Sequence, residues 1–329
     1  MSGRLLIHIG LAKAGSSFLQ STLFSGRYPG LHVVDDPGLA RWQGKGSARY
    51  LKSGANLFFD QVTGGNGVLS WEPTDRSWQI RDTLSLMPPG EGLVVSNEEW
   101  AGHPFSGGVY GEIIGRRIKE SFPDAKILIL LREQRKLAFS TYVDYVVRHG
   151  GTASLRRFLA PGQVGQVPQH NIQFYRFSHM VNWYYREFGQ RNVMVLPAEI
   201  LFAQPEDTLR RILGFIGAEA GDVPSMPGTE NRGRYGVYCA HRLLPFLNLM
   251  AVPAPTNGYA TINLRWVRST IREVAGAVMP DALQKRIIGR DRRMIERALA
   301  EVVTADNGIL QTLVSHDLRA LGYLMPEPA

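Results

Sequence analysis

The sequence predicts an α/β fold, in which a central, mainly parallel sheet of about five strands is flanked by helices. Short apolar runs rich in β-branched residues alternate with helix-period patterns along the 329 residues, as in βαβ units. These runs are continuously apolar rather than alternating, which suits strands that are covered on both faces. The strand candidates are residues 4–9, 31–34, 92–96, 126–131 and 193–197.

The helical patterns extend to the end of the chain, so we expect one domain over residues 1–329. Residues 237–329 are mostly helical and are expected to pack on the sheet within that domain. Residues 35–91 predict an insertion with short helices or a lid, because a plain loop of that length is uncommon. Gly- and Pro-rich segments at 150–169 and 219–236 predict loops. The helix candidates are residues 16–25, 110–121, 134–148, 171–188, 205–216, 237–249, 264–276 and 280–302.

The composition favours a globular protein with anionic partners. Hydrophobic residues make up 44% of the chain, enough to build a large core. The chain carries 37 Lys and Arg against 29 Asp and Glu, a net charge of +8. This charge favours nucleotides, nucleic acid, sulfated glycans or lipid surfaces without choosing among them. It is equally compatible with a solvated basic surface.

The cysteine count and the apolar runs favour a soluble, cytoplasmic chain. Cys239 is the single cysteine, so the chain has no intrachain disulfide, and no His or Asn pattern around it indicates a catalytic thiol. The apolar run 5–9 is too short for a signal peptide and leads directly into a Gly-rich turn. The longest apolar stretch, residues 127–131, is too short to span a bilayer.

The turn after the first predicted strand reads GLAKAGSS and is a candidate anion site. Gly10 and Gly15 allow a tight backbone, and a helix opens at Ser16, where hydroxyls add donors. Backbone N–H groups and the positive end of a helix dipole then point at one spot, which suits a 5′-phosphate. A nucleotide triphosphatase would carry GxxxxGK[ST] here, but Ser16 replaces that lysine and Lys13 lies inside the loop. The alternative is an ordinary strand–turn–helix.

A second candidate anion site follows the predicted strand 126–131. Arg132 comes directly after this strand, and Ser140 follows eight residues later on a predicted helix. In a kinase or ATPase with a phosphate loop, this strand end commonly carries an Asp that helps to hold Mg²⁺. A guanidinium at this point instead binds phosphate through two parallel hydrogen bonds. The alternative is an arginine that pairs with a surface carboxylate.

The first segment resembles the 5′-phosphosulfate loop of sulfotransferases that use 3′-phosphoadenosine 5′-phosphosulfate (PAPS). The family pattern is roughly P-K-[ST]-G-[ST]-[ST], and Lys13 to Ser17 matches it except at Ala14, which replaces Ser or Thr. Ala12 replaces the usual Pro. The preceding residues 7–11, IHIGL, also resemble bacterial members. Neither replacement removes a charge from the loop.

The second segment resembles the 3′-phosphate motif of the same family, approximately R-x-P-x₅-S-x-Y. Arg132, Ser140 and Tyr142 match this motif, and Gln134 departs from the usual Pro. The resemblance implies a P-loop-like fold in which Arg132 and Ser140 hold the 3′-phosphate that distinguishes PAPS from ATP. Weaker similarity extends over residues 177–217.

The resemblance places a general base after the third predicted strand, in the segment GLVVSNEEW. Many bacterial members carry a Ser-[Ser/Asn]-Glu pattern here, which makes Glu98 the base, with Glu99 and His103 as fallbacks. The carboxyl ends of parallel strands are also where ligand sites form in such sheets. The alternative is a pair of solvated carboxylates that cap a helix.

The predicted catalytic residues are therefore Lys13, which would stabilise the transferring sulfonate, and Glu98. The nucleotide site implied by the resemblance comprises Lys13, Ala14, Gly15, Ser16, Ser17, Phe18, Arg132, Ser140 and Arg232. Phe18 stands where cytosolic members place an aromatic ring under the adenine, and a core position suits it equally. Arg232 and Arg234 lie in a late loop that closes over the 3′-phosphate in the family.

The resemblance implies PAPS as donor, adenosine 3′,5′-bisphosphate as product, and no metal. The acceptor would be a hydroxyl or amine of a carbohydrate, lipid or small metabolite, and residues 35–91 would shape its site. A P-loop kinase or ATPase-like protein is a second reading, which Mg²⁺ dependence would distinguish. A third is a non-enzymatic binder of anions or glycans through the basic helix 283–297. No nucleic-acid partner is expected.

Overall fold

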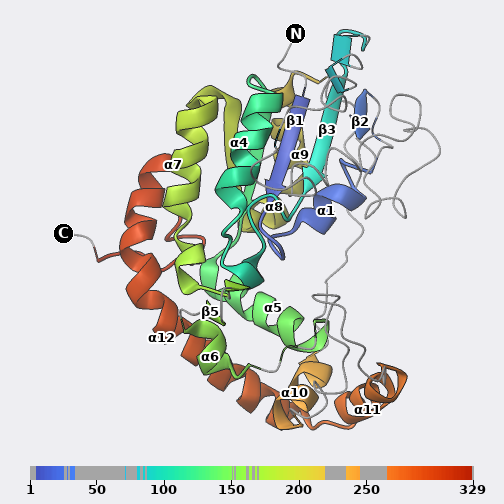
Figure 1. The fold of residues 1–329 in the computed structure, drawn as a ribbon, viewed down its shortest axis with the longest axis vertical. Helices are drawn as coiled ribbons and strands as arrows, with labels where there is room; N and C mark the ends of the chain where they lie inside the picture. Colours follow the sequence, from blue (N-terminus) through green and yellow to red (C-terminus); the bar gives the residue numbers. More distant parts are fainter. Residues whose placement is uncertain are drawn as a thin grey trace.

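The sheet expected from the five apolar runs is present (Figure 1). The computed structural model describes residues 5–25, 28, 30–33, 71, 80–81, 84–85, 87–149, 151, 153–160, 163–164, 167–168, 170–218, 235–244 and 265–327. Within these residues, five strands form one parallel sheet in the order β2-β3-β1-β4-β7. The strands are β1 (Leu5–Gly10), β2 (Leu31–Val33), β3 (Gly92–Asn97), β4 (Lys126–Leu131) and β7 (Val193–Pro197). Each lies within one residue of its predicted bounds.

The central strands are continuously apolar because both faces of the sheet are covered. In the register, Ile7 of β1 pairs with Val95 of β3 and with Ile127 of β4. All residues of β1 and of β3 are buried. Burying one such aliphatic side chain contributes about 1.5–3 kcal/mol. The hydrophobic effect therefore fixes these strands and, with them, the points at which they end.

Each of the eight predicted helices is present at least in part. The helices of the described residues are α1 (Ser16–Ser21), α4 (Gly111–Ser121), α5 (Gln134–Val147), α6 (Leu155–Leu159), α7 (Phe177–Phe188), α8 (Ala198–Ala203), α9 (Pro205–Ile216), α10 (Tyr235–Leu243), α11 (Arg265–Ala277) and α12 (Asp281–Leu313). The predicted α/β fold, a parallel sheet flanked by helices, is therefore confirmed.

The predicted loop at residues 150–169 and the predicted end of the first helix are both wrong. The segment 150–169 is not a plain loop, because it contains α6 and a short antiparallel pair, β5 (Gln163–Val164) with β6 (Val167–Pro168). The first helix, α1, ends at Ser21 rather than at residue 25, and residues 22–24 form turns. The phosphate-loop helix is therefore short.

The last helix, α12, is longer than its sequence predicts. It continues to Leu313 instead of ending at residue 302. Asn307 and Gly308 are poor helix formers, which indicates an end, but tertiary contacts override weak propensity. Asn307 is buried inside α12 and is hydrogen-bonded to Gln134 of α5. We find α12 packed mainly against α5 and α7, helices that themselves flank the sheet.

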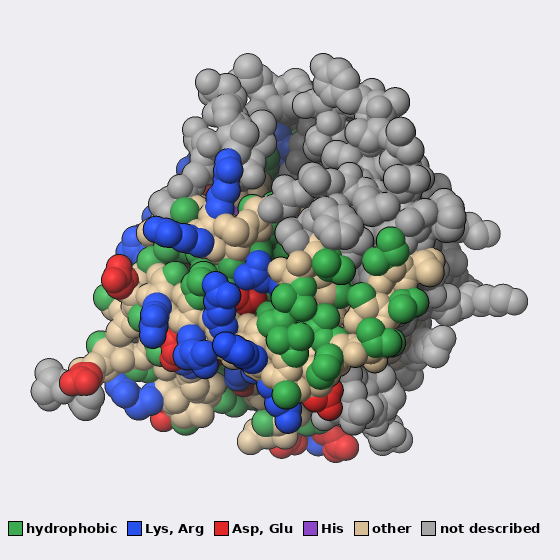
Figure 2. Space-filling view, turned by 90° about the horizontal axis from the view of Figure 1, so that it is seen from below, with side chains coloured by type: hydrophobic (Ala, Val, Ile, Leu, Met, Phe, Trp, Pro, Cys, Tyr) green, Lys and Arg blue, Asp and Glu red, His purple; other side chains and the backbone are tan. Residues whose placement is uncertain are grey.

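The basic segment 283–297 forms the exposed face of an amphipathic helix. Ile295, Leu299 and Val303 recur every four residues along α12 and are fully buried. The intervening Lys and Arg side chains are exposed, and Figure 2 shows Lys and Arg gathered beside hydrophobic side chains on the lower face. Among the helices of the described residues, none is both long and apolar enough to cross a membrane.

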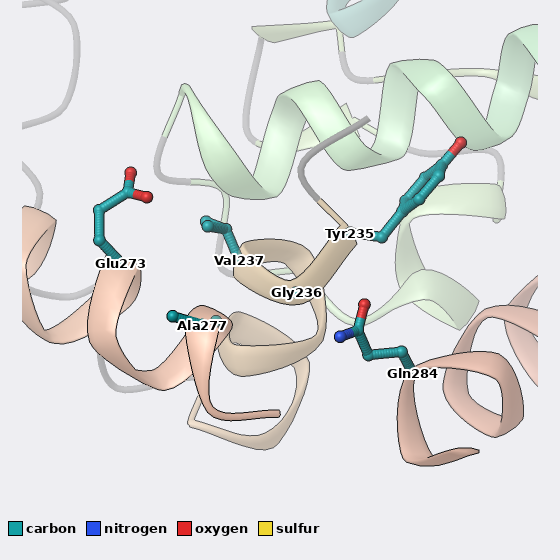
Figure 3. Close-up of a pocket in the computed structure, with 7 residues that line it drawn as sticks. Tyr235, Gly236, Val237, Glu273, Ala277 and Gln284 are labelled. Carbon is teal, nitrogen blue, oxygen red and sulfur yellow. The ribbon is translucent and has the colours of Figure 1, made fainter. Parts of the chain in front are cut away.

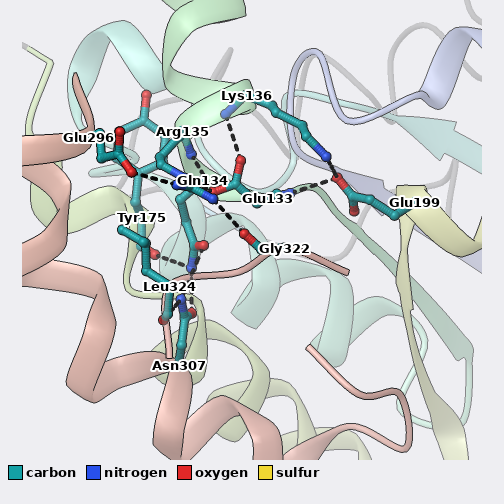
Figure 4. Close-up of polar contacts among 10 residues, drawn as sticks. All are labelled: Glu133, Gln134, Arg135, Lys136, Tyr175, Glu199, Glu296, Asn307, Gly322 and Leu324. Carbon is teal, nitrogen blue, oxygen red and sulfur yellow. Dashed lines mark hydrogen bonds and ion pairs between the residues drawn. The ribbon is translucent and has the colours of Figure 1, made fainter. Parts of the chain in front are cut away.

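Polar contacts fix the start of α5, directly after β4 (Figure 4). Glu133 caps the helix, because its carboxylate accepts from the backbone N–H groups of Arg135 and Lys136. The side chain of Gln134 donates to Asn307 Oδ1 at 2.6 Å and accepts from Asn307 Nδ2 at 3.3 Å. This buried amide pair joins α5 to α12, which explains a polar residue where the family motif has Pro.

Candidate functional site

Three parallel strands end at one edge of the sheet, and a predicted site residue follows each of them. β1 leads into the turn with Lys13, β3 leads into Glu98, and β4 leads into Arg132. β1 lies between β3 and β4, so these three ends are neighbours. α5 lies beyond the same edge (Figure 1). The order of the strands therefore brings together residues that are far apart in the sequence.

The turn after β1 has a strained backbone that Arg132 helps to hold. Lys13 has a φ of 71°, and it is the one non-glycine residue with positive φ in the described part of the chain. This left-handed conformation costs about 1–2 kcal/mol for a residue with a side chain. Gly15 follows with a φ of 109°. The Ala14 N–H donates to the Leu11 carbonyl at 2.9 Å, and Arg132 Nη1 donates to the Lys13 carbonyl at 2.7 Å.

Ser16 lies at the start of α1 and is buried beneath this turn. Its Oγ has no hydrogen-bond partner among the residues that the structure describes. A Cβ at Gly10 would collide with this Oγ, so the glycine leaves room for the hydroxyl. Ser17 is exposed. Because α1 has only six residues, its first-turn N–H groups, rather than a long helix dipole, are what the turn offers to an anion.

Phe18 lies on α1 beside a second aromatic ring that the sequence did not single out. Phe18 is half-buried, and its ring makes an edge contact with Phe202 of α8, with 5.8 Å between ring centroids. Phe202 is 50% exposed. A Cβ at Gly15 would approach the Phe202 ring to 3.0 Å, so this ring lies against the turn. An aromatic surface therefore borders the candidate anion site.

The ammonium of Lys13 contacts a carboxylate on α5. Lys13 Nζ lies 2.8 Å from Oδ1 of Asp144. The same carboxylate lies 3.4 Å from Arg148 Nε and 3.2 Å from His149 Nε2. Burial raises the pKa of Asp144, but the hydrogen bonds from His149 and Lys13 outweigh it and lower the pKa to about 2. Asp144 is therefore ionised at neutral pH.

Glu98 follows β3 and is half-buried near Lys13. Burial raises the pKa of Glu98 above its ordinary value. The charge of Lys13 opposes this rise, and the charges of Glu99 and Asp144 add to it. A carboxylate with a raised pKa is a better proton acceptor than an ordinary surface carboxylate.

A buried histidine fixes the end of β3 just before Glu98. His8 Nδ1 and Ser96 Oγ are 2.8 Å apart, and Gln20 Nε2 donates to the same Oγ at 3.3 Å. His8 is fully buried, and burial lowers its pKa to about 3, so its ring is neutral. This contact joins β1, α1 and β3 immediately beneath the candidate site.

The two fallback bases lie in different surroundings from Glu98. Glu99 is exposed, and its backbone N–H donates to the side chain of Asn97 at 2.7 Å. His103 is half-buried, and its Nδ1 accepts from the backbone N–H of Phe105 at 3.2 Å. Burial lowers the pKa of His103. One ring nitrogen of His103 is therefore engaged in a local turn, and Glu98 is the more enclosed of the two carboxyl groups.

Two residues of the second motif, Arg132 and Ser140, are half-buried, whereas the third, Tyr142, is buried in the core. Arg132 is half-buried and forms no ion pair with any described residue, which differs from an arginine held by a surface carboxylate. Ser140 is half-buried on α5, one turn before Asp144. Tyr142 is buried, and its hydroxyl donates to the Ala153 carbonyl at 3.1 Å, so this motif residue lies in the core.

Several predicted parts of the site lie outside the described residues. They are Arg232 and Arg234, the late loop that carries them, and most of the segment 35–91. A hollow between α10, α11 and the start of α12 is described, and Tyr235, Gly276 and Gln284 line part of it (Figure 3). Among the described residues that line this hollow, Glu273 is the one charged side chain, which does not suit an anionic donor. In the described part of the chain, no group of three or more His, Cys, Asp or Glu could hold a metal ion.

Sequence reasoning missed Asp144, which pairs with Lys13, and the two residues Arg148 and His149 that also contact Asp144. A signal for two of them was available. Ser140, Asp144 and Arg148 are spaced four residues apart, so they lie on one face of α5. The third, His149, follows the end of the helix and carries no such periodic signal.

Comparisons with known proteins agree with the resemblance seen in the sequence. Residues 115–222 match the model of a sulfotransferase family, and this segment includes Arg132 and Ser140. No curated protein sequence matches the chain. A sulfotransferase from Alicyclobacillus acidocaldarius is similar at 22% identity, covering 75% of this chain and 94% of that chain, with a TM-score of 0.43.

A mouse sulfotransferase, SULT7A1 complexed with PAP, is similar at 13% identity, covering 94% of this chain and 89% of that chain, with a TM-score of 0.41. The family match covers about a third of the chain, and it falls on the segment with the second anion motif. The resemblance to sulfotransferases is thereby confirmed over residues 115–222.

Proposed function

We propose that the chain transfers a sulfonate group from PAPS to a hydroxyl or amine of a carbohydrate, lipid or small metabolite. The observation that carries this proposal is the contact between the two motifs, in which Arg132 Nη1 donates to the Lys13 carbonyl at 2.7 Å. This contact supports a single site that contains two separate cationic side chains. Such a pair suits a nucleotide with phosphate groups at both ends of its ribose.

The turn after β1 has the features that a 5′-phosphosulfate requires. The buried Ser16 Oγ has no partner among the described residues, so an oxygen acceptor would satisfy it. Lys13 Nζ can turn from Asp144 toward an anion, because the side chain of Lys13 is 26% exposed. PAPS would supply the sulfonate, and Lys13 would stabilise the charge that develops on the leaving phosphate oxygen.

Arg132 and Ser140 would hold the 3′-phosphate. A guanidinium has five N–H donors, so the single bond to the Lys13 carbonyl leaves others for a phosphate. Arg232 would add a further positive charge from the late loop. The exposed ring of Phe202, together with Phe18, offers an apolar surface of the kind that suits an adenine base.

Glu98 would act as the general base. In the transfer, a bond forms between the acceptor oxygen or nitrogen and sulfur, and the sulfur–oxygen bond to the phosphate breaks. The acceptor proton passes to Glu98, and adenosine 3′,5′-bisphosphate (PAP) leaves. The raised pKa and partial burial of Glu98 support this role over that of the exposed Glu99.

The direct test is release of PAP from PAPS by the purified protein, with an acceptor screen, in the presence of a metal chelator. We expect turnover that persists without divalent metal, because Lys13 and backbone N–H groups take the charge. Lys13→Ala and Arg132→Ala should each reduce turnover by about 100-fold or more. Arg186→Ala, which removes an exposed charge on α7, is the matched control and should leave turnover unchanged. Turnover that requires Mg²⁺ and consumes ATP would instead identify a kinase.

A further inference from the structure

Asp144 is a half-buried charge next to Lys13, and it has no role in the proposed transfer mechanism. Its side chain is only 14% exposed, and it accepts from Lys13 Nζ at 2.8 Å. Asp144 lies on α5 one turn after Ser140, so the same helix face presents both the predicted phosphate ligand and this carboxylate. A carboxylate at this position occupies the ammonium that a bound anion would need.

The ion pair places Asp144 in competition with any anion that Lys13 binds. One ammonium group has three donors, and a phosphate oxygen that takes them must draw Lys13 away from the carboxylate or share it. The ion pair lies in a partly buried setting, where charges are weakly screened, so drawing Lys13 away from Asp144 costs free energy. The competition therefore lowers the affinity for a nucleotide at this turn.

Asp144 can take part in this exchange because it has other partners. Arg148 Nε lies 3.4 Å from Oδ1, and His149 Nε2 lies 3.2 Å from Oδ2. When the ammonium of Lys13 turns toward an anion, these two groups still contact the carboxylate. A buried carboxylate left without any partner would be costly, and this arrangement avoids that cost.

We propose that Asp144 is a positioning residue that holds the Lys13 ammonium against α5 and competes with the 5′-phosphate of the nucleotide for it. The inference rests on the proposed function. Its consequence is a limit on the affinity for the product PAP, which shares the 5′-phosphate with the donor. Because product release limits many enzymes, weaker product binding favours turnover.

The test is a double-mutant cycle measured by titration calorimetry with PAP. The four proteins are the wild type, Asp144→Asn, Lys13→Ala and the double variant. Asp144→Asn removes the charge while keeping nearly the same shape. We expect it to tighten PAP binding about five- to tenfold in the wild-type background. In the Lys13→Ala background, the same substitution should change the affinity less than about twofold, because the contested ammonium is gone.

Two results would overturn the inference while leaving the proposed function in place. One is PAP binding by the wild type with no gain in Asp144→Asn. The other is an equal gain in both backgrounds, which would make Asp144 a repulsive charge acting independently of Lys13. A wild type that fails to bind PAP would overturn the proposed function and this inference together.

Controls separate the local contact from net charge and from folding. Glu112→Gln removes one negative charge from an exposed pair with Arg116 on α4, and it should leave PAP affinity within about 1.5-fold of wild type. A thermal melt checks that Asp144→Asn is folded. If that variant does not fold, Asp144→Ser enters the same cycle with the same expected gain. Failure of a folded serine variant to tighten binding would also contradict the inference.

Discussion

The surroundings of Glu98 distinguish it from the adjacent Glu99 as the candidate general base. Glu98 and Glu99 are adjacent in the sequence, but Glu98 is half-buried near Lys13 whereas Glu99 is exposed. Burial raises the pKa of Glu98, and the charge of Lys13 moderates this rise. A general base works best when its pKa lies close to the working pH, because it is then still ionised and also accepts a proton readily.

We predict that Glu98→Gln lowers turnover about 100-fold or more, because general-base catalysis contributes about 10²–10⁴-fold. PAP affinity should stay within about threefold of wild type, since the amide keeps the size of the side chain. The measurements are turnover with an acceptor identified by the screen and calorimetry with PAP. Glu99→Gln is the matched control and should retain turnover.

The pH dependence of turnover follows from the same residue. Only ionised Glu98 can accept a proton, and its raised pKa means that ionisation is complete only above the ordinary range of a glutamate. Turnover should therefore rise with pH through this raised pKa, and Glu98→Gln should lose that limb. A wild-type profile with its acid limb at the pKa of an ordinary solvated glutamate would argue against a buried base.

Some residues of the candidate site could be predicted from the sequence, and others could not. The proximity of Lys13 and Arg132 could be predicted, because local motifs place each at a strand end and the strand ends meet at one sheet edge. Asp144 could not be predicted with the same ease, because its role depends on where the side chain of Lys13 lies. The backbone of Lys13, with a φ of 71°, is likewise a consequence of the folded turn.

At the scale of elements, α5 connects the candidate site to the C-terminal helix. Arg132 and Glu133 precede the helix, and Ser140 and Asp144 lie along it. Its first residue, Gln134, exchanges two hydrogen bonds with Asn307 in a buried amide pair. Position and orientation of α5 therefore depend on α12, although the two helices are far apart in the sequence.

We predict that Gln134→Pro destabilises the protein by about 1–3 kcal/mol, even though it restores the residue of the family motif. The first helical position tolerates the Pro backbone, so the cost comes from leaving Asn307 Oδ1 without the donor that Gln134 provides, while Asn307 Nδ2 keeps its bond to the Leu324 carbonyl. The free energy of unfolding in urea measures this cost. Gln134→Ala should cost about as much, and exposed Gln190→Ala should cost less than about 0.5 kcal/mol.

A Gln134→Pro variant as stable as wild type would show that the amide pair contributes nothing. The same contact explains why the length of α12 was underestimated. Helix propensity falls at Asn307 and Gly308, and the pattern alone indicates an end. The buried partner on α5 compensates for this weakness, and a partner more than 170 residues away leaves no local signal in the sequence.

At the scale of the whole molecule, the order of the strands explains why motifs that are distant in the sequence lie close together. β1, β3 and β4 are adjacent and parallel, so their carboxyl ends lie at the same edge. The five strands could be predicted within one residue because continuous apolar runs report burial on both faces directly. The order of the strands could be expected only through the family resemblance, since many orders satisfy the same apolar pattern.

The contact between Arg132 and the Lys13 carbonyl joins two motifs that are 119 residues apart in the sequence. The two candidate anion-binding motifs follow the adjacent strands β1 and β4, and they are proposed to hold one nucleotide at its two phosphate positions. Neither motif alone would distinguish a bisphosphate from a monophosphate. The joint action of both strand ends is therefore what an experiment must detect.

The most direct measurement is calorimetric comparison of PAP with AMP, which lacks only the 3′-phosphate. We predict that the wild type binds PAP at least about 100-fold more tightly than AMP, because Arg132 and Ser140 contribute charge-assisted hydrogen bonds to that phosphate. Arg132→Ala should remove most of this difference. Equal affinities for PAP and AMP in the wild type would contradict the account.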